Sequence, residues 1–304
     1  MGLRACLAAV VLLVGAPARA QSDHAQSDGP PPAKTGDSAT GSVTITGERP
    51  TNQSLDSVVS GFVRSRTTLA PHLDQIIRWR KPICPLVRGV KPEFVTFITA
   101  RIEGMAEEVG APALTKATCK PDVEVIFTDQ PQAMMDEVAR KSPVLLGYHF
   151  VNQTQALAKV TKPIQAWYVT ATSNGVDTYI NDPYEMMPGG ALGSRLDHGH
   201  LVSVFDHVLV VVDMTRINGR HLGPIADYVA MLTLAQPTPS GGCDGLPSLL
   251  DLFADTCPDR QKPEMLTSAD KAYLEGLYSV TPEDVGPLQR AAIETHMLKS
   301  LDGP

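Results

Sequence analysis

Two histidines separated by one residue, His198 and His200, form the tightest group of possible metal ligands in the chain. On an extended backbone, residues i and i+2 face the same side, so the pair could chelate a metal ion together with Asp197 or His207. Gly199 between them disfavours a regular strand, and no third ligand stands at a recognisable spacing. The pair is a weak candidate for a metal site, and we predict no bound metal.

A second candidate is Asp227, an isolated carboxylate in the apolar segment His221–Pro237, which follows the strand-like run VLVVVD. A helix that is apolar on nearly all sides belongs in a core. Gly223-Pro224 opens this helix, and proline suits the first helical position. A carboxylate near that end can accept amide hydrogen bonds and faces the positive end of the helix dipole. We therefore predict a structural carboxylate at Asp227. The alternative is an acid that lines a cleft together with Tyr228.

A serine pattern is the third candidate. Ser268 and Lys271 match the S-x-x-K pattern of serine acyltransferases. Thr267 and Asp270 fit a reciprocal cap at the start of a helix better. No G-x-S-x-G motif occurs, and no glycine-rich phosphate loop follows a strand. We therefore assign no catalytic residue and predict no cofactor.

Residues 1–20 have the features of a secretory signal. One arginine precedes a short apolar run that ends in Ala18-Arg19-Ala20, a small-x-small cleavage pattern. The run is too short to span a bilayer, and no later run reaches eighteen apolar residues. We expect an exported chain without a transmembrane segment after signal removal. The formal charge of −7, without a basic block, argues against a nucleic-acid partner.

The cysteines agree with export. Without Cys6, which lies in the signal, four remain, and an even number in an exported chain predicts two disulfides. Pairing of nearest neighbours, Cys84–Cys119 and Cys243–Cys257, is preferred over the other two connectivities. A metal site built from the four thiolates is the alternative, but no CxxC spacing supports it.

The remaining chain divides into a spacer and one domain. Residues 21–50 are polar and rich in proline and glycine, which predicts a disordered spacer that ends in an extended arm, GSVTITGERP. Residues 51–304 are predicted to form a single α+β domain with a mixed sheet and a central buried helix. The strands are expected at 122–128, 165–172 and 203–213. Helices are expected from Leu55 onwards and at 91–109, 131–140, 223–236, 266–278 and 285–298.

The order of these parts resembles a zincin. More narrowly, it is similar to a family of uncharacterised exported bacterial proteins, a domain of unknown function, with a degenerate metzincin-like core. The segments that carry the resemblance are Arg78-Trp79, RIEGMAEEVG, VEVIFT, ADYVAMLTLAQ, LPSLLDLF and LTSADKAYLEGLY. The resemblance places Ala226, Asp227 and Ala230 at the positions of a His-Glu-x-x-His zinc motif. The two alanines have no donor atom, so the resemblance implies a pseudo-metalloprotease. LPSLL likewise has no methionine where metzincins have their Met-turn.

These observations together favour a non-catalytic protein in the periplasm of a Gram-negative bacterium that binds a peptide, a protein or an envelope component. The resemblance implies a former substrate cleft beside Asp227 and Tyr228, where a peptide could add to the sheet as a strand. One alternative is a metal-dependent hydrolase that uses His198, His200 and a carboxylate. Another is a structural envelope accessory that acts through the N-terminal arm.

Overall fold

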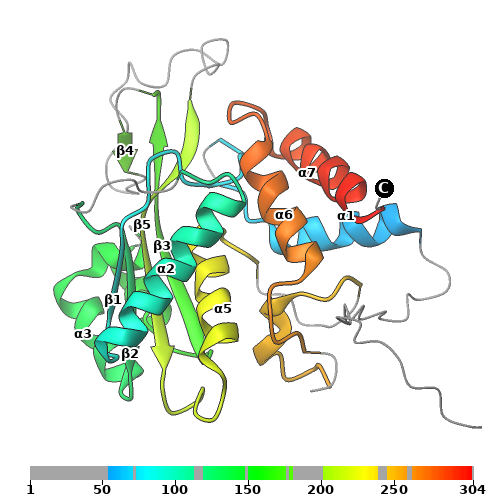
Figure 1. Ribbon diagram of the computed structural model, residues 1–304. Helices are drawn as coiled ribbons and strands as arrows, with labels where there is room; N and C mark the ends of the chain where they lie inside the picture. The colour runs from blue at the N-terminus through cyan, green and yellow to red at the C-terminus, as the bar shows by residue number, and fades with distance from the viewer. Residues whose placement is uncertain are drawn as a thin grey trace, which may run out of the picture. The chain divides into compact units, whose positions relative to one another are not determined.

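The computed structural model describes residues 54–70, 73–112, 119–147, 150–175, 178–180, 201–238, 245–258 and 262–302 (Figure 1). All of these residues lie in one compact unit, Gly47–Pro304. Within it, helices and one mixed sheet confirm the predicted α+β class. The expected signal and the expected spacer with its arm lie outside the described residues.

The sheet has five strands in the order β1-β2-β5-β3-β4. They are β1 (Pro85–Arg88), β2 (Val123–Thr128), β3 (Ile164–Ser173), β4 (Thr178–Ile180) and β5 (Val202–Asp213). β1, β2 and β5 run parallel, whereas β3 runs antiparallel to both β5 and β4. The central strand β5 is therefore the junction between the parallel and antiparallel parts of the sheet.

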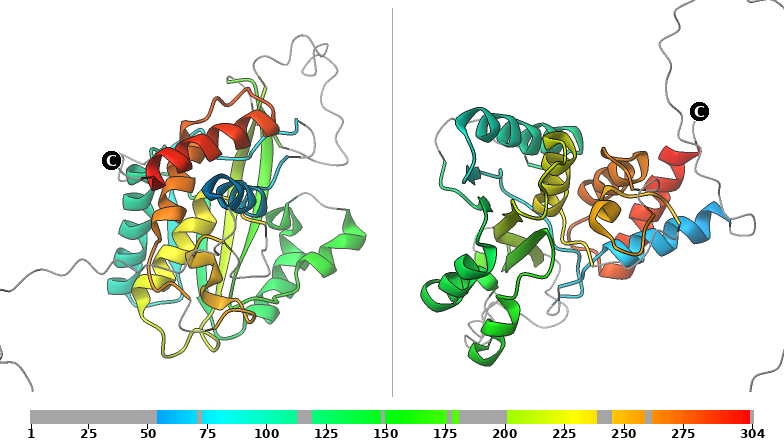
Figure 2. Two further views of the ribbon diagram at one scale, coloured as in Figure 1. Left: turned by 90° about the vertical axis from the view of Figure 1, so that its right-hand side faces the viewer. Right: turned by 90° about the horizontal axis from the view of Figure 1, so that it is seen from below.

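Helices cover both faces of the sheet (Figures 1 and 2). On one face lie α2 (Pro92–Glu108) and α5 (Leu222–Leu234); on the other lie α3 (Pro131–Lys141), a 3-10 turn (Pro143–Leu146) and α4 (Val151–Leu157). The 3-10 turn Leu249–Phe253 packs against α5, and α7 (Gly286–Leu301) packs against both α6 (Ser268–Ser279) and α1 (Leu55–Arg66).

The unbroken apolar run of β5 follows from this double covering. Val208, Val210 and Val212 enter the main core with α2 and α5, while Leu209 and Val211 enter a smaller core with α3. A strand covered on both faces reads as continuous apolar sequence rather than as an alternation. The interior is thus set by β5 and by α5, which follows it directly.

Side-chain hydrogen bonds hold both ends of helix α6. The predicted cap is confirmed: the Asp270 amide donates to the Thr267 hydroxyl (3.0 Å), and the Thr267 amide donates to the Asp270 carboxylate (3.1 Å). At the other end the buried Arg78 guanidinium donates to the Leu277 and Val280 carbonyls at 2.6 and 2.7 Å. These bonds satisfy orphan carbonyls of the last helical turn. Desolvation lowers the pKa of Arg78 to about 10.

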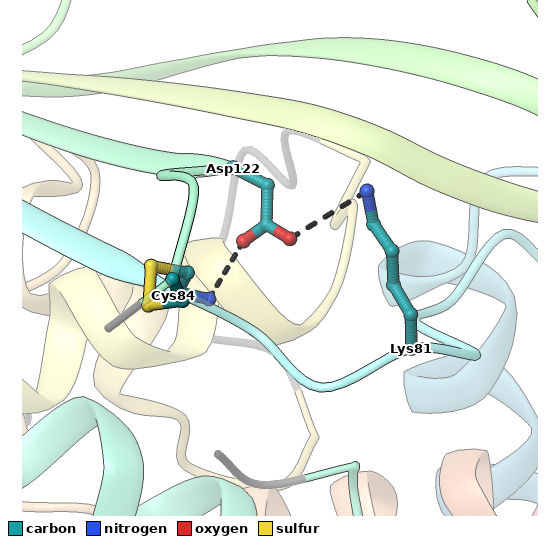
Figure 3. Close-up of a disulfide and its surroundings, with 4 residues drawn as sticks. Lys81, Cys84 and Asp122 are labelled. Atoms are coloured by element: carbon teal, nitrogen blue, oxygen red, sulfur yellow. Dashed lines mark hydrogen bonds and ion pairs between the residues drawn. A yellow bond between two sulfur atoms is a disulfide. The ribbon is translucent and has the colours of Figure 1, made fainter. Parts of the chain in front are cut away.

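One predicted disulfide is confirmed, Cys84–Cys119 (Figure 3). The Asp122 carboxylate accepts a hydrogen bond from the Cys84 amide (2.7 Å) and pairs with Lys81 (3.6 Å), so the start of β1 is tied to the approach of β2. Both of its cysteines lie in the described part of the chain, where Cys257 is also disulfide-bonded. Cys243 lies outside that part, so the pairing Cys243–Cys257 stays a prediction.

Two sequence-based expectations were wrong or incomplete. β1, β4 and α4 were not predicted. α5 begins at Leu222, so Pro224 occupies its third position rather than its first. Asp227 is therefore more than one turn inside the helix, beyond the orphan amides of its start.

Candidate binding site

Ala226 and Ala230, the two alanines that the resemblance aligns with a zinc motif, are closed off from solvent. Ala226 and Ala230 are both 0 % exposed, and both belong to the main core beneath α2. An alanine has no metal-binding atom, and these two positions offer no room for a ligand from outside. The histidine candidates His198 and His200 lie outside the described residues. In the part that is described, no group of three His, Cys, Asp or Glu side chains could hold a metal ion.

Asp227 faces the neighbouring helix α2. Arg101 of α2 binds it with two donors: Nε contacts one carboxylate oxygen, and one terminal nitrogen donates to the other oxygen at 2.9 Å. The Asp227 side chain is 3 % exposed, while that of Arg101 is 50 % exposed. The hydrogen bond from Arg101 to Asp227 is the main cause that raises the pKa of the guanidinium.

The interpretation of Asp227 as a helix-start carboxylate was therefore wrong. Its partner is a side chain on α2, because α5 begins five residues before it and the free amides of the helix start lie out of reach. The residue remains structural, but it joins two helices instead of capping one. Both of its oxygens are engaged by the same guanidinium, a bidentate geometry that fixes carboxylates firmly.

Tyr228, the next residue, faces away from α2 and lines a pocket of about 480 Å³. Its ring packs edge-on against Phe253, with 5.2 Å between the ring centroids. The side chain is 5 % exposed, and its hydroxyl makes no hydrogen bond within the described residues. Burial raises the pKa of Tyr228 to about 12, so the hydroxyl stays a donor at neutral pH.

The pocket lies where β3, the end of α5 and the end of α1 meet. Ile164, Ala166 and Tyr168 of β3 form one wall, and Arg66 at the end of α1 and Lys162 before β3 contribute the charged groups. Asp227 is not among the residues that line it. The structure thus places Tyr228 at the pocket and Asp227 elsewhere, although the two are neighbours in the sequence.

The electrostatics of the pocket are set by two cations. Arg66 pairs with Asp251 at 2.8 Å, and both side chains are buried, at 5 % and 4 % exposed. Lys162 lies exposed at the rim, and partial desolvation followed by repulsion from Arg66 lowers its pKa. The two charged residues of the lining therefore carry the same sign.

The edge of β3 beside the pocket is open. β3 pairs with β5 along its whole length, but β4 pairs with it only at Ala171–Ser173. In an antiparallel pair, successive residues direct their backbone groups alternately to the two sides. The Asp213 amide donates to the Pro163 carbonyl (2.9 Å), so Pro163 points toward β5 and Ile164 points away from it.

The same alternation places the backbone groups of Ile164, Ala166 and Tyr168 on the open edge. No backbone hydrogen bond to these outward groups occurs within the described ranges. The side-chain oxygen Oε1 of Gln236, which also lines the pocket, is buried without a hydrogen-bond partner in the described part of the chain. The pocket is therefore bordered by unused donors and acceptors.

A second pocket, of about 660 Å³, lies at the other end of β3 and β5. Its charged lining residues are Arg80, Lys81, Asp206 and Glu283. Two cations and two anions leave no dominant sign, so its charge does not indicate a class of ligand.

The residues that define the first pocket were only partly found from the sequence. Tyr228 was selected, but Arg66, Lys162 and the open edge of β3 were not. Two local signals existed: an arginine ends a helix with an apolar face, and a lysine-proline pair precedes a strand. Neither signal indicates that Arg66 and Lys162 line the same pocket, because the two residues lie almost one hundred residues apart in the sequence.

Comparison with known proteins places no name on this site. No family model, no curated protein and no solved structure matches the chain. Within the described residues, no helix is long and apolar enough to cross a membrane. The site is therefore interpreted from its own geometry.

Proposed function

We propose that the protein is a non-catalytic, exported, periplasmic protein that binds an extended peptide segment along the open edge of β3. The observation that carries this proposal is the backbone of Ile164, Ala166 and Tyr168, whose outward groups are unpaired within the described residues and lie beside the pocket at Tyr228. An exposed strand edge is a template for another strand, which gains main-chain hydrogen bonds while neighbouring pockets select its side chains.

The non-catalytic part of the proposal is supported by α5. Ala226 and Ala230 carry no ligand atom and are buried, and Asp227 is held by Arg101 through both oxygens. A carboxylate paired in this way is poorly placed to activate water or to take up a proton from a substrate. In this proposal the former catalytic helix serves as one wall of a binding cleft.

The proposed kinship with a degenerate zincin rests on the arrangement of the same parts. α5 follows the central strand β5 directly and packs on the sheet, and the antiparallel strand β3 lies on the far side of β5 from the parallel strands. The signal-like residues 1–20 and the disulfide Cys84–Cys119 support export into an oxidising compartment.

The binding proposal can be tested by selecting ten-residue peptides from a phage-displayed library on the purified protein. Ala166→Pro removes one outward-facing amide without breaking the pairing with β5, because proline is tolerated where its nitrogen faces away from the ladder. We expect selected peptides to bind this variant at least tenfold more weakly. Phe94→Ala, on the exposed face of α2, is the control and should bind as the unaltered protein does.

A scan of N-methylated peptides then identifies the binding mode. In strand addition, methylation at alternate residues abolishes binding while methylation at the intervening residues leaves it intact. Uniform sensitivity, or full binding to Ala166→Pro, would exclude the edge of β3 as the site.

The alternative functions give different results. Cleavage of a selected peptide, with stoichiometric zinc that is lost in a His198→Ala/His200→Ala double variant, would support a hydrolase. Loss of an envelope partner on deletion of residues 21–50, with peptide binding unchanged, would support an accessory that acts through the arm.

A further inference from the structure

We propose that the pocket beside Tyr228 selects an acidic side chain, Asp or Glu, from the peptide that adds to β3. This inference rests on the proposed function, since the peptide backbone must first pair with the strand edge. It adds a chemical class to the ligand: a strand with a carboxylate at the position opposite Ala166.

The charge of the lining is the first support. Within the described residues, Arg66 and Lys162 are the only charged groups in the pocket wall, and no carboxylate belongs to it. Asp251, which does not line the pocket, pairs with Arg66 and offsets its charge. The net positive charge of the pocket lining therefore comes from Lys162. A negative group in the pocket therefore meets a complementary field, and a positive group meets a repulsive one.

The hydroxyl of Tyr228 is the second, independent support. It belongs to a side chain that is 5 % exposed, it lines the pocket, and it donates to no acceptor in the described part of the chain. By contrast, the hydroxyls of Tyr168, Tyr273 and Tyr278 all donate to backbone carbonyls. A carboxylate oxygen is an acceptor that would satisfy the Tyr228 donor, and charge-assisted hydrogen bonds are stronger than neutral ones.

The geometry of the strand edge indicates that the carboxylate in the pocket comes from a side chain of the peptide and not from its C-terminus. Residues that lie opposite each other on paired strands direct their side chains to the same face of the sheet. A residue opposite Ala166 therefore points its side chain to the face on which Ala166 and Tyr168 contact the core beside α5. The methyl group of Ala166 fills little of this space, so the incoming side chain can reach toward Tyr228.

The electrostatic state of Lys162 agrees with this assignment. Desolvation and repulsion from Arg66 lower the pKa of Lys162 in the free protein. A carboxylate between the two cations would replace part of that repulsion with attraction. The repulsion between the two cations is thus one that a bound acid relieves.

The test uses a fluorescently labelled peptide with blocked ends, acetyl-Ser-Thr-Val-Thr-Xaa-Thr-Val-Thr-Ser-amide, in which Xaa is Glu, Gln or Lys. Its dissociation constant is measured by fluorescence anisotropy. We expect the Glu peptide to bind at least tenfold more tightly than the Gln peptide, and the Lys peptide to bind most weakly. In Lys162→Gln and in Tyr228→Phe the preference for Glu over Gln should fall below threefold.

The matched control is Lys159→Gln. Lys159 is exposed, lies three residues before Lys162 and is absent from the pocket wall, so its removal changes the net charge equally but should preserve the tenfold preference. A further arm uses the Gln peptide with a free C-terminal carboxylate. If that peptide binds as tightly as the blocked Glu peptide, the pocket takes a chain terminus, and the inference is overturned.

The remaining outcomes separate this inference from the proposed function. Equal affinity for the Glu, Gln and Lys peptides, with weaker binding to Ala166→Pro, overturns the acidic preference and keeps strand addition. No binding of any of the three peptides at 1 mM, a concentration on the order of the weakest specific affinities, also overturns the inference. The library selection then decides the proposed function separately.

Discussion

The two sides of helix α5 treat their polar groups in opposite ways. Toward α2, Asp227 is buried against Arg101, which engages both carboxylate oxygens. Toward β3, Tyr228 is buried at a pocket, and its hydroxyl has no acceptor in the described part of the chain. The first side is closed and paired within the protein, whereas the second is open and leaves the Tyr228 hydroxyl to solvent.

This difference teaches which of two neighbouring residues is the better functional candidate. A buried polar group that is fully paired holds a fold together, and removing its partner costs free energy. A polar group that faces a pocket and is left to solvent has kept its capacity to bind something else. Asp227 stood out in the sequence as an isolated carboxylate, but Tyr228 occupies the position from which a ligand can be contacted.

Both sides also contain an arginine–aspartate pair, and the two pairs differ in solvent exposure. Arg66 and Asp251 are 5 % and 4 % exposed, whereas Arg101 is 50 % exposed above a buried Asp227. Solvent screens the second pair more strongly, so the free energy lost on breaking each pair should differ.

The largest effect is expected for Arg66→Met. The substitution leaves the buried Asp251 carboxylate without its cation, and breaking a buried ion pair in this way costs about 3–5 kcal/mol. Urea denaturation should report that loss in the free energy of unfolding. Arg64→Met, at an exposed arginine on the same helix, is the control and should change it by less than about 0.5 kcal/mol. Equal effects of the two substitutions would show that the Arg66–Asp251 pair does not stabilise the pocket side.

The next effect is expected for Arg101→Met. Asp227 again loses its cation, but the half-exposed position of Arg101 allows water to approach, so we expect about 2 kcal/mol, below the range for fully buried pairs. The control is Arg140→Met, which breaks an exposed pair with Glu137 and should cost less than about 1 kcal/mol. A loss as small as that of the control would mean that Asp227 is satisfied without Arg101.

A smaller effect is expected for Asp227→Asn. The amide keeps the size of the side chain and one acceptor oxygen, while its NH₂ group meets a donor of Arg101, so we expect a loss of about 1–2 kcal/mol. Peptide selection on this variant should give the same sequences as on the unaltered protein, because Asp227 does not line the pocket. Loss of peptide binding at unchanged stability would assign Asp227 to the binding site instead.

The local part of this architecture could be predicted from the sequence. The buried strand β5 and the buried helix α5 follow from long apolar runs, and α2 follows from its apolar stripe. The cap at Thr267 and Asp270 follows from residues three positions apart. Each of these features depends on neighbours in the chain, so periodicity and spacing are sufficient to find it.

The features that depend on distant partners could not be predicted in this way. Asp227 and Arg101 are separated by 126 residues, and no periodicity links them. β1 is a strand because it pairs with β2 and is tied by Cys84, not because the four residues Pro85–Arg88 favour that structure by themselves. The open edge of β3 is likewise invisible in the sequence, since alternation identifies a strand but not its neighbours.

The smallest effect on stability, and the sharpest on binding, is expected for Tyr228→Phe. The lost hydroxyl donates no hydrogen bond in the described part of the chain, so the free energy of unfolding should change by less than about 0.5 kcal/mol. Tyr278→Phe is the matched control, because its hydroxyl donates to the Leu234 carbonyl at 2.7 Å and its removal should cost about 1 kcal/mol. The control should keep the preference for the Glu peptide that Tyr228→Phe loses. If Tyr228→Phe destabilises the protein as much as Tyr278→Phe does, the Tyr228 hydroxyl has a structural partner, and both sides of α5 are closed.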